Sequence, residues 1–282
     1  MNNDEGMAGN GQPLIRVCGL TKSYSRRSGT WKKHIDIAAV RGIDFEIPAG
    51  KTLALVGSSG SGKSTLARCV ARLEKPDTGQ VYVGGKDISC MGPHELGEFR
   101  CRIQMIFQDA ATSMNPRFSA AEIVEEPLLI QKRCGKVERR SVVDELMSEV
   151  GLSPEWADRR AMEFSGGQRQ RLAIARALAL QPQILILDEA LSGLDLSTEA
   201  QIVNLLLELQ TAHSLTYLFI SHDLALVSRI ADIIAVIAAG SIVEQGPAAQ
   251  VITNPNHVET KALMASAALF QKNYAELLRA SG

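Results

Sequence analysis

The sequence predicts an α/β protein in which a mainly parallel sheet is covered by helices and one helical block interrupts the alternation. Short runs of branched apolar residues alternate with helical patterns along most of the 282 residues. The region from Ser119 to Leu180 differs, because apolar residues recur there at three- and four-residue spacing without an intervening strand pattern. Strands that alternate with helices are typical of parallel sheets, because each crossover connection needs a covering helix.

The individual elements follow from the local patterns. The predicted strands are Leu14 to Val17, Ile43 to Ile47, Thr52 to Val56, Ile103 to Phe107, Ile184 to Leu187, Leu215 to Ile220 and Ile233 to Ile237. Outside the helical block, the predicted helices are Lys63 to Leu73, Ser197 to Leu209, Leu224 to Ile230 and, in the tail, about Glu259 to Arg279. A basic, glycine-containing segment, Ser25 to His34, is interpreted as a loop between the first two strands.

Composition excludes several classes of protein. The net charge of −1 argues against a protein that coats nucleic acid, since that function needs a cationic surplus. No C-x-x-C pair occurs among the five cysteines, so we expect reduced thiols rather than disulfides or a zinc site. The polar N-terminus does not resemble a signal peptide, and the longest apolar run, Ile233 to Ala239, is too short for a membrane helix. We therefore expect a chain that does not span a membrane.

A phosphate-binding loop is the first chemical motif. It fits G-x-x-x-x-G-K-[ST], with a strand before it and a helix after it. Its residues are Gly57, Ser58, Ser59, Gly60, Ser61, Gly62, Lys63, Ser64 and Thr65. Glycines let successive backbone N–H groups face one anion, Lys63 can reach the β- and γ-phosphates, and the Ser64 hydroxyl can bind Mg²⁺.

Two adjacent carboxylates form the second motif. Asp188 and Glu189 follow the apolar run from Ile184, at the carboxyl end of a predicted buried strand, where open α/β sheets bind ligands. A carboxylate at the position of Asp188 suits Mg²⁺ bridged to nucleotide phosphates. The neighbouring Glu189 can act as the general base that polarises an attacking water.

The remaining motifs resemble one family. With Phe164-Ser-Gly-Gly-Gln-Arg-Gln-Arg171 and Leu218-Phe-Ile-Ser-His-Asp223, the chain resembles the nucleotide-binding subunits of ATP-binding-cassette (ABC) transporters over roughly residues 14–253. The resemblance implies a P-loop NTPase core with an N-terminal antiparallel β part and an inserted helical subdomain, about residues 109–180. We expect residues 1–255 to form this nucleotide-binding domain and residues 256–282 to form a C-terminal helical tail.

The resemblance also implies roles for matching residues. Ser165, Gly166, Gly167 and Gln168 correspond to the signature loop, which contacts ATP held by the opposite subunit. The remaining matches are Gln108 for the glutamine loop that contacts Mg²⁺ or water, His222 for the switch histidine at the γ-phosphate, Asp195 for the interface aspartate and Tyr24 for the aromatic residue that stacks on adenine. Trp31 is a weaker candidate for the adenine contact.

Several segments resemble the peptide/nickel importer branch of the family, and within it the second of two ATPase subunits. The extended glutamine loop Phe107-Gln-Asp-Ala-Ala-Thr-Ser-Met-Asn-Pro116 is one of them. The implied partners are a second ABC ATPase subunit, identical or different, two transmembrane permeases and an extracytoplasmic substrate-binding protein, and no nucleic acid. The implied cofactors are ATP and Mg²⁺, and the implied location is the cytoplasmic face of the cell membrane.

Three departures from the family pattern limit the prediction. Ala190 stands where proline is usual, which weakly favours nickel over peptide, and Gly193 replaces a common alanine or asparagine. In the tail, Val258 and Glu259 occupy positions where the branch has proline and tyrosine, so any docking role of the tail stays open.

Two other functions compete with transport. One is a soluble ABC-type ATPase in DNA repair or translation, which usually has two cassettes or a long coiled-coil insertion. This chain has one phosphate loop and only about 50 residues between Gln108 and Ser165. The other is a regulatory nucleotide-binding module without turnover, which Glu189 and His222 disfavour.

Overall fold

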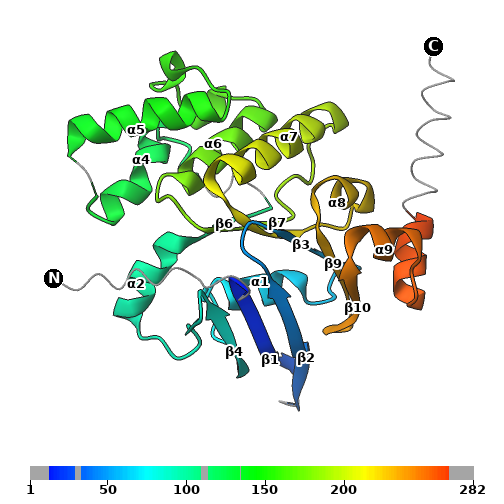
Figure 1. Cartoon of the computed structure of the whole chain (residues 1–282). Helices are drawn as coiled ribbons and strands as arrows, with labels where there is room; N and C mark the ends of the chain where they lie inside the picture. Colours follow the sequence, from blue (N-terminus) through cyan, green and yellow to red (C-terminus); the bar gives the residue numbers. More distant parts are fainter. Residues whose placement is uncertain (1–12, 29–32, 109–113, 134, 267–282) are drawn as a thin grey trace, which may run out of the picture. The chain divides into compact units, whose positions relative to one another are not determined.

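The computed structural model describes residues 13–28, 33–108, 114–133 and 135–266 (Figure 1). By its internal contacts the chain divides into two compact units. The first unit comprises Met1–Pro93 and Leu218–Gly282, and the second comprises His94–Tyr217. Within the described ranges no helix is both long and apolar enough to cross a membrane.

An antiparallel sheet forms one part of the first unit. Its strand order is β2-β1-β4-β5. The strands are β1 (Ile15–Ser28), β2 (Lys33–Ile47), β4 (Thr78–Val83) and β5 (Lys86–Asp87). This sheet confirms the expected N-terminal antiparallel part. Strands β4 and β5 were not predicted, although the pair Gly84-Gly85 between them is a hairpin signal.

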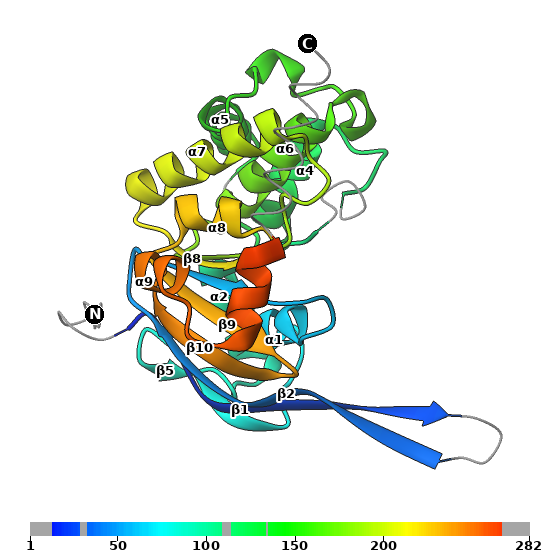
Figure 2. The ribbon, with the colours of Figure 1, turned by 90° about the vertical axis from the view of Figure 1, so that its right-hand side faces the viewer.

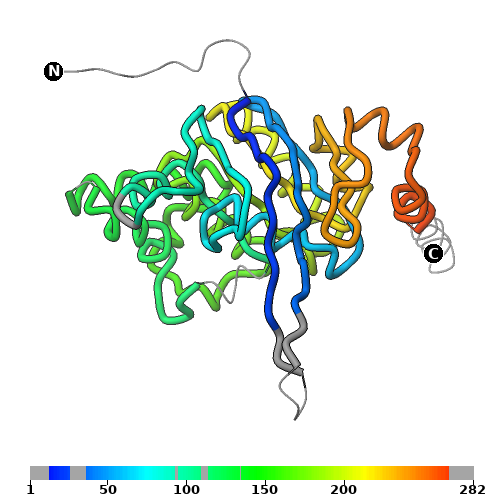
Figure 3. The backbone as a smooth tube through the Cα atoms, turned by 90° about the horizontal axis from the view of Figure 1, so that it is seen from below, coloured from blue at the N-terminus to red at the C-terminus, as the bar shows by residue number. Residues whose placement is uncertain are grey.

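The β1–β2 hairpin corrects the prediction of a loop from Ser25 to His34 at both ends of that range, while its residues 29–32 lie outside the described residues. The two strands stay paired from Ile15↔Ile47 to Ser28↔Lys33, and Figures 2 and 3 show the long ribbon that results. Cross-strand contacts sustain the pairing along this polar segment, as the hydrogen bond from Ser25 to Asp36 illustrates. The prediction placed the end of the first strand too early, because the local composition of a segment carries no information about a strand that pairs with it.

The remaining strands of the first unit carry the phosphate loop. The pairing β3·β9 is parallel and β9·β10 is antiparallel, and β8 lies next to β3 in the strand order. Their bounds are β3 (Thr52–Val56), β8 (Thr216–Ile220, of which Leu218–Ile220 belong to this unit), β9 (Ile233–Ala238) and β10 (Ser241–Pro247). Every residue of β3 and β8 is buried, which explains their continuous apolar sequences.

Three helices with assigned bounds accompany these strands, and a fourth helical stretch lies in the tail. The three are α1 (Lys63–Val70), α8 (Leu224–Ile230) and α9 (Ala248–Thr253). Residues 258–266 are also helical, which agrees with the start of the predicted tail helix, and the rest of that prediction lies outside the described residues. The carboxylate of Glu244 holds the chain before this helix, accepting from the backbone N–H of Asn256 and His257 at 2.8 and 2.9 Å.

The second unit is mostly helical and contains the predicted helical block. Its elements are α2 (Pro93–Arg102), β6 (Ile103–Ile106), α4 (Ala120–Ile130), α5 (Lys136–Glu149), two 3₁₀ turns (Pro154–Trp156 and Ala161–Glu163), α6 (Gly166–Leu178), β7 (Ile184–Asp188) and α7 (Leu196–His213). The strands β6 and β7 are parallel neighbours. A capping box starts α4, because Ser119 and Glu122 exchange side-chain and backbone hydrogen bonds. The α/β class with an inserted helical part is confirmed.

Candidate functional site

The phosphate loop lies between β3 and α1 of the first unit, as predicted. Two of its glycines are required by close packing, and a Cβ on the first, Gly57, would lie 2.2 Å from the carbonyl oxygen of Ile237. A Cβ on Gly62 would lie 2.2 Å from the carbonyl oxygen of Ala39, and Gly62 has φ of +107°, which favours glycine. The loop is therefore pressed against the backbone of β2 and β9, which fixes its curvature.

The loop also fixes the position of its lysine. Lys63 is buried, and its ammonium donates to the carbonyl oxygens of Gly57 and Ser58 at 2.8 and 3.0 Å. It is the first residue of α1, whose N-cap Gly62 provides no side-chain cap. A cation and a helix N-terminus thus sit at one turn, an arrangement that favours an anion.

One loop residue tests the fit of a phosphate group. Ser61 is buried, and its hydroxyl oxygen makes no hydrogen bond to any of the residues that the structure describes. Such a buried hydroxyl is costly unless another group bonds to it. A phosphate oxygen in the loop would supply that partner, so the loop residues fit a bound nucleoside triphosphate.

Tyr24 lies on β1, where its hydroxyl donates to the carboxylate of Glu74. Partial burial and this hydrogen bond raise the pKa of the Tyr24 hydroxyl, although a hydrogen bond with Thr65 lowers it. Thr65 belongs to the phosphate loop, so the structure brings Tyr24 to the start of α1. Trp31, the weaker adenine candidate, lies outside the described residues.

His222 lies between β8 and α8, also in the first unit, and its side chain is exposed. Both neighbours fix its backbone. Ser221 donates its backbone N–H to the Leu55 carbonyl on β3 at 3.3 Å, and Asp223 caps α8 by accepting from the N–H of Ala225 at 2.7 Å. Since β3 leads into the phosphate loop, His222 follows the strand beside the one that carries the loop.

The carboxylate motif lies at the end of β7 in the second unit. Parallel pairing of Ile106 with Leu187 places the residues after β6 and β7 at the same edge. Asp188, the last residue of β7, is 7% exposed, whereas Gln108, two residues after Ile106, is exposed. The sequence therefore correctly predicted that Asp188 lies at the carboxyl end of a buried strand with Glu189 directly after it, and the register adds Gln108 to the same edge.

Glu189 has an unusual backbone. Its φ is +47°, in the left-handed region that side chains other than glycine adopt at a cost. Its carbonyl accepts from the backbone N–H of Ser192 at 3.1 Å and from the Ser192 hydroxyl at 2.8 Å, which stabilises the turn. Retained strain of this kind clusters at functional sites, because it fixes the direction of a side chain.

The signature residues form the N-terminus of α6. Ser165 is the N-cap: its hydroxyl accepts from the Gln168 N–H at 3.3 Å, and its own N–H donates to the Gln168 side chain at 2.9 Å. Gly166 and Gly167 follow, and a Cβ on Gly167 would lie 2.4 Å from Cγ2 of Thr198. Glycine here lets the start of α6 approach the start of α7.

Asp195 is the N-cap of α7. Its carboxylate accepts from the hydroxyls and the backbone N–H groups of Ser197 and Thr198. These hydrogen bonds hold the pKa of Asp195 well below its usual range. The structure thus gives Asp195 and Ser165 capping roles that the sequence analysis did not assign, although both show the signals of N-caps, an acid or serine just before a helix.

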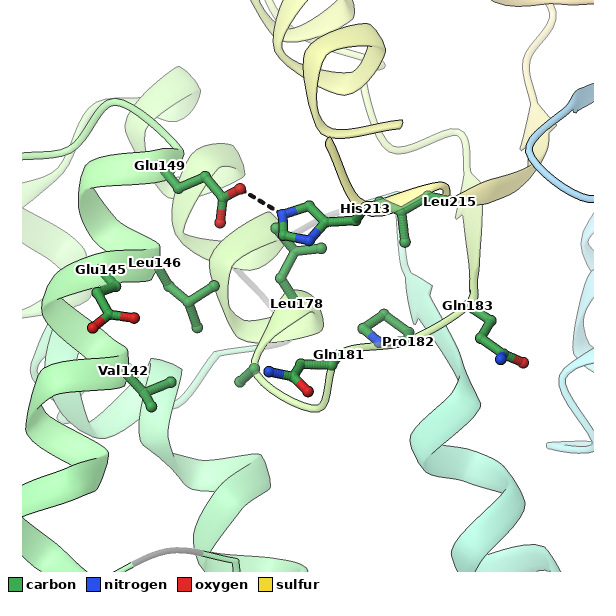
Figure 4. Close-up of a pocket in the computed structure, with 11 residues that line it drawn as sticks. Val142, Glu145, Leu146, Glu149, Leu178, Gln181, Pro182, Gln183, His213 and Leu215 are labelled. Carbon is green, nitrogen blue, oxygen red and sulfur yellow. Dashed lines mark hydrogen bonds and ion pairs between the residues drawn. The ribbon is translucent and has the colours of Figure 1, made fainter. Parts of the chain in front are cut away.

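A pocket of about 420 Å³ lies elsewhere in the second unit (Figure 4). In it, Nε2 of His213 at the end of α7 lies 2.5 Å from a carboxylate oxygen of Glu149 at the end of α5. The lining residues are Val142, Glu145, Leu146, Glu149, Leu178, Ala179, Gln181, Pro182, Gln183, His213 and Leu215. No predicted site residue lines this pocket. The residues predicted to bind and hydrolyse nucleotide lie instead on loops at strand ends and helix N-termini.

These loops define a class of protein. The first unit holds a phosphate loop with a buried lysine and an exposed histidine after the adjacent strand, and the second holds a carboxylate pair after a buried strand and a serine–glycine helix start. This set of motifs is the one that the sequence analysis matched to ATP-binding cassettes. The family model described as ABC transporter matches residues 40–192. The chain belongs to the ABC transporter family and is an ABC ATPase.

Relatives narrow the comparison. The chain is 46% identical over 255 residues to a probable peptide ABC transporter ATP-binding protein, y4tS, of Sinorhizobium fredii, covering 90% of this chain and 72% of the relative. It is 43% identical to the di/tripeptide transport ATP-binding protein DppF of Pseudomonas aeruginosa, covering 90% and 79%.

A solved structure with a similar fold is the dimeric, post-hydrolysis state of the ATP-binding cassette MJ0796 bound to ADP and Pi. It has a TM-score of 0.74 and 29% identity, covering 83% of this chain and 99% of that one.

Proposed function

We propose that the chain is one ATPase subunit of an importer that carries peptides across the cell membrane. The observation that carries the proposal is the identity of 43–46% with peptide-transport ATP-binding proteins over nine-tenths of the chain. None of the relatives reported above is named for nickel transport, so they favour the peptide alternative. Residues 1–255 are proposed as the nucleotide-binding domain, with residues about 109–180 as its helical subdomain and residues 256–282 as the tail.

Nucleotide binding starts at the phosphate loop. The ammonium of Lys63 is proposed to exchange its carbonyl partners for the β- and γ-phosphates, and backbone N–H groups at the start of α1 are proposed to face the same anion. Ser64, Asp188 and Gln108 are proposed to hold Mg²⁺, which would neutralise charge that develops on the phosphates. Tyr24 is proposed to stack on adenine.

Hydrolysis requires a general base and a water molecule positioned to attack the γ-phosphate. We assign the base to Glu189, whose left-handed backbone fixes its direction at the edge where Asp188 and Gln108 also lie. His222 is proposed to contact the γ-phosphate. The helix start at Ser165–Gln168 is proposed to face ATP held by a second cassette, and the dimeric state of the similar cassette supports this pairing.

Coupling to permeases is proposed for the segment from Gln108 to Ile130. Its described part presents two large apolar side chains to solvent at the end of α4: Leu129 is 47% exposed and Ile130 69%. Exposed apolar side chains grouped near one helix end favour a protein partner. The proposed partners are two permeases, a second ATPase subunit of the same or a different sequence, and a binding protein outside the membrane, with this chain on the cytoplasmic face.

The test uses the assembled transporter in proteoliposomes. Glu189→Gln keeps the shape of the side chain but removes the base, so we expect ATP hydrolysis and ATP-driven uptake of a labelled dipeptide to fall together by at least about 100-fold. Labelled nickel serves as the second substrate. Wild-type hydrolysis by Glu189→Gln would overturn the base assignment, and uptake of nickel without peptide would overturn the substrate.

A further inference from the structure

Tyr24 does not stand alone on the hairpin. It pairs directly with Ile37 of β2, and directly opposite residues of antiparallel strands project from the same face of the sheet. Both are exposed, Tyr24 by 38% and Ile37 by 49%. The first unit therefore presents an aromatic ring and an aliphatic side chain side by side to solvent, a combination that suits a flat aromatic ligand.

The far end of the Tyr24 ring is tied to the helix that follows the phosphate loop. One carboxylate oxygen of Glu74 accepts the Tyr24 hydroxyl, and Nε of Arg68 lies 3.0 Å from the other. The backbone N–H of Glu74 also donates to the Arg68 carbonyl at 3.1 Å. Arg68 belongs to α1, so Glu74 links the hairpin to the same helix whose first residue is Lys63.

We propose that Glu74 is a positioning residue, which holds the Tyr24 ring beside Ile37 as one wall of the adenine site. The inference rests on the proposed binding of ATP at the phosphate loop and adds a residue 50 positions from Tyr24 in sequence. Glu74 does not touch the base. Its hydrogen bond excludes orientations of the Tyr24 ring that cannot stack on adenine. ATP binding therefore does not pay the entropy of ordering the Tyr24 side chain.

The expected effects concern binding of the adenine part of ATP and not binding of its phosphates. Tyr24→Phe removes the hydroxyl and keeps the ring, and Glu74→Ala removes the acceptor. Each is expected to raise the KM for ATP by about 3- to 10-fold, the range of one hydrogen bond, with kcat unchanged. The double variant is expected to behave like Tyr24→Phe, because that variant has already lost the contact with Glu74 together with the hydrogen bond to Thr65.

The experiment measures ATPase kinetics of the assembled transporter with inorganic tripolyphosphate as a competitive probe that has no base. The inhibition constant of tripolyphosphate should stay at the wild-type value in every variant. Glu74→Gln keeps an acceptor oxygen and should restore much of the ATP affinity, which shows that the fold is intact. Ser25→Ala is the matched control, because it removes the neighbouring hairpin hydrogen bond to Asp36, and its KM should match the wild type.

Two results would overturn the inference. One is a wild-type KM for ATP in Glu74→Ala, and the other is an equal weakening of tripolyphosphate, which would mean that Glu74 supports the loop and not the base. Failure of ATP binding at the phosphate loop gives a different result: tripolyphosphate would then not compete with ATP even in the wild-type complex, and an adenine wall beside that loop would be overturned with it.

Discussion

Two glycine-rich helix starts in this chain differ in what lies at their unpaired backbone N–H groups. At α6, the side chains of Ser165 and Gln168 satisfy each other's backbone groups in a capping box. At α1, Gly62 supplies no side-chain cap, and a buried lysine occupies the turn instead. The capping box at α6 satisfies the backbone N–H of Gln168 through a side chain, whereas the α1 start places a cation where an anion would bind. The difference indicates that side chains of the chain itself order the α6 start, while the α1 start depends more strongly on a bound anion.

The largest expected effect comes from removing the cation at α1. Lys63→Ala is expected to lower ATP hydrolysis by the assembled transporter at least about 100-fold, because no other group of the loop supplies a positive charge to the transferring phosphate. Lys51→Ala is the matched control, since Lys51 forms an exposed ion pair with Asp232 at 2.9 Å and such pairs contribute little. Equal loss in both variants would contradict the assignment.

The two helix starts should also respond differently to an added methyl group. In Gly167→Ala the new Cβ meets the side chain of Thr198, with Cγ2 at 2.4 Å, whereas in Gly62→Ala it meets the backbone of Ala39 at a φ of +107°. We expect urea unfolding to show a loss of about 1–3 kcal/mol for Gly167→Ala and a larger loss for Gly62→Ala.

A second substitution sharpens this contrast. Thr198→Ser removes Cγ2 but keeps the hydroxyl that donates to Asp195, so Gly167→Ala with Thr198→Ser should recover most of the lost stability. Failure of that rescue would show that Gly167 is needed for its backbone and not for close packing, and the two helix starts would then be more alike than the structure indicates.

The smallest expected effect concerns the charge on the cap of α7, next to the α6 start. Hydrogen bonds from Ser197 and Thr198 hold the pKa of Asp195 below its usual range. The resulting stability is present above the unfolded-state pKa, about 3.9, and is lost as the pH falls toward the folded-state value. The wild type should therefore melt at a higher temperature than Asp195→Asn near neutral pH, and the gap should narrow below about pH 4. A gap that does not change with pH would contradict this role.

Sequence reasoning succeeded where local pattern and chemistry coincide. The run Thr52 to Val56 before the phosphate loop is a strand with those bounds, and Leu224 to Ile230 is a helix with those bounds. In the strand, a short apolar run favours burial, and the phosphate-loop motif after it marks where the strand ends. The phosphate loop and the acid pair were predicted in the same way, because glycine, lysine and paired acids at fixed spacing have few structural alternatives. The other candidate site residues were predicted from the resemblance to the family.

The missed features depend on partners that are distant in sequence. Nothing near Tyr24 indicates that Glu74 accepts its hydroxyl, and nothing near Ser25 indicates that β2 continues opposite it. The left-handed backbone of Glu189 also has no sequence signal, since glycine or asparagine would be expected at such a φ. The capping box at Ser165, by contrast, was visible as serine followed by glutamine three residues later.

The pairing of the β1–β2 hairpin constrains how the chain can change its length. The register shifts between Lys22 and Ser23, just before Tyr24 pairs with Ile37. Successive residues of a strand point to opposite faces, so one residue inserted or deleted between Ser23 and Tyr24 would turn the ring to the other side of the ribbon. Additions beyond Ser28 keep Tyr24 and Ile37 in frame. The hairpin can therefore change in length beyond Ser28 during evolution. Near Tyr24, residues can be substituted but not inserted or deleted without turning the ring away.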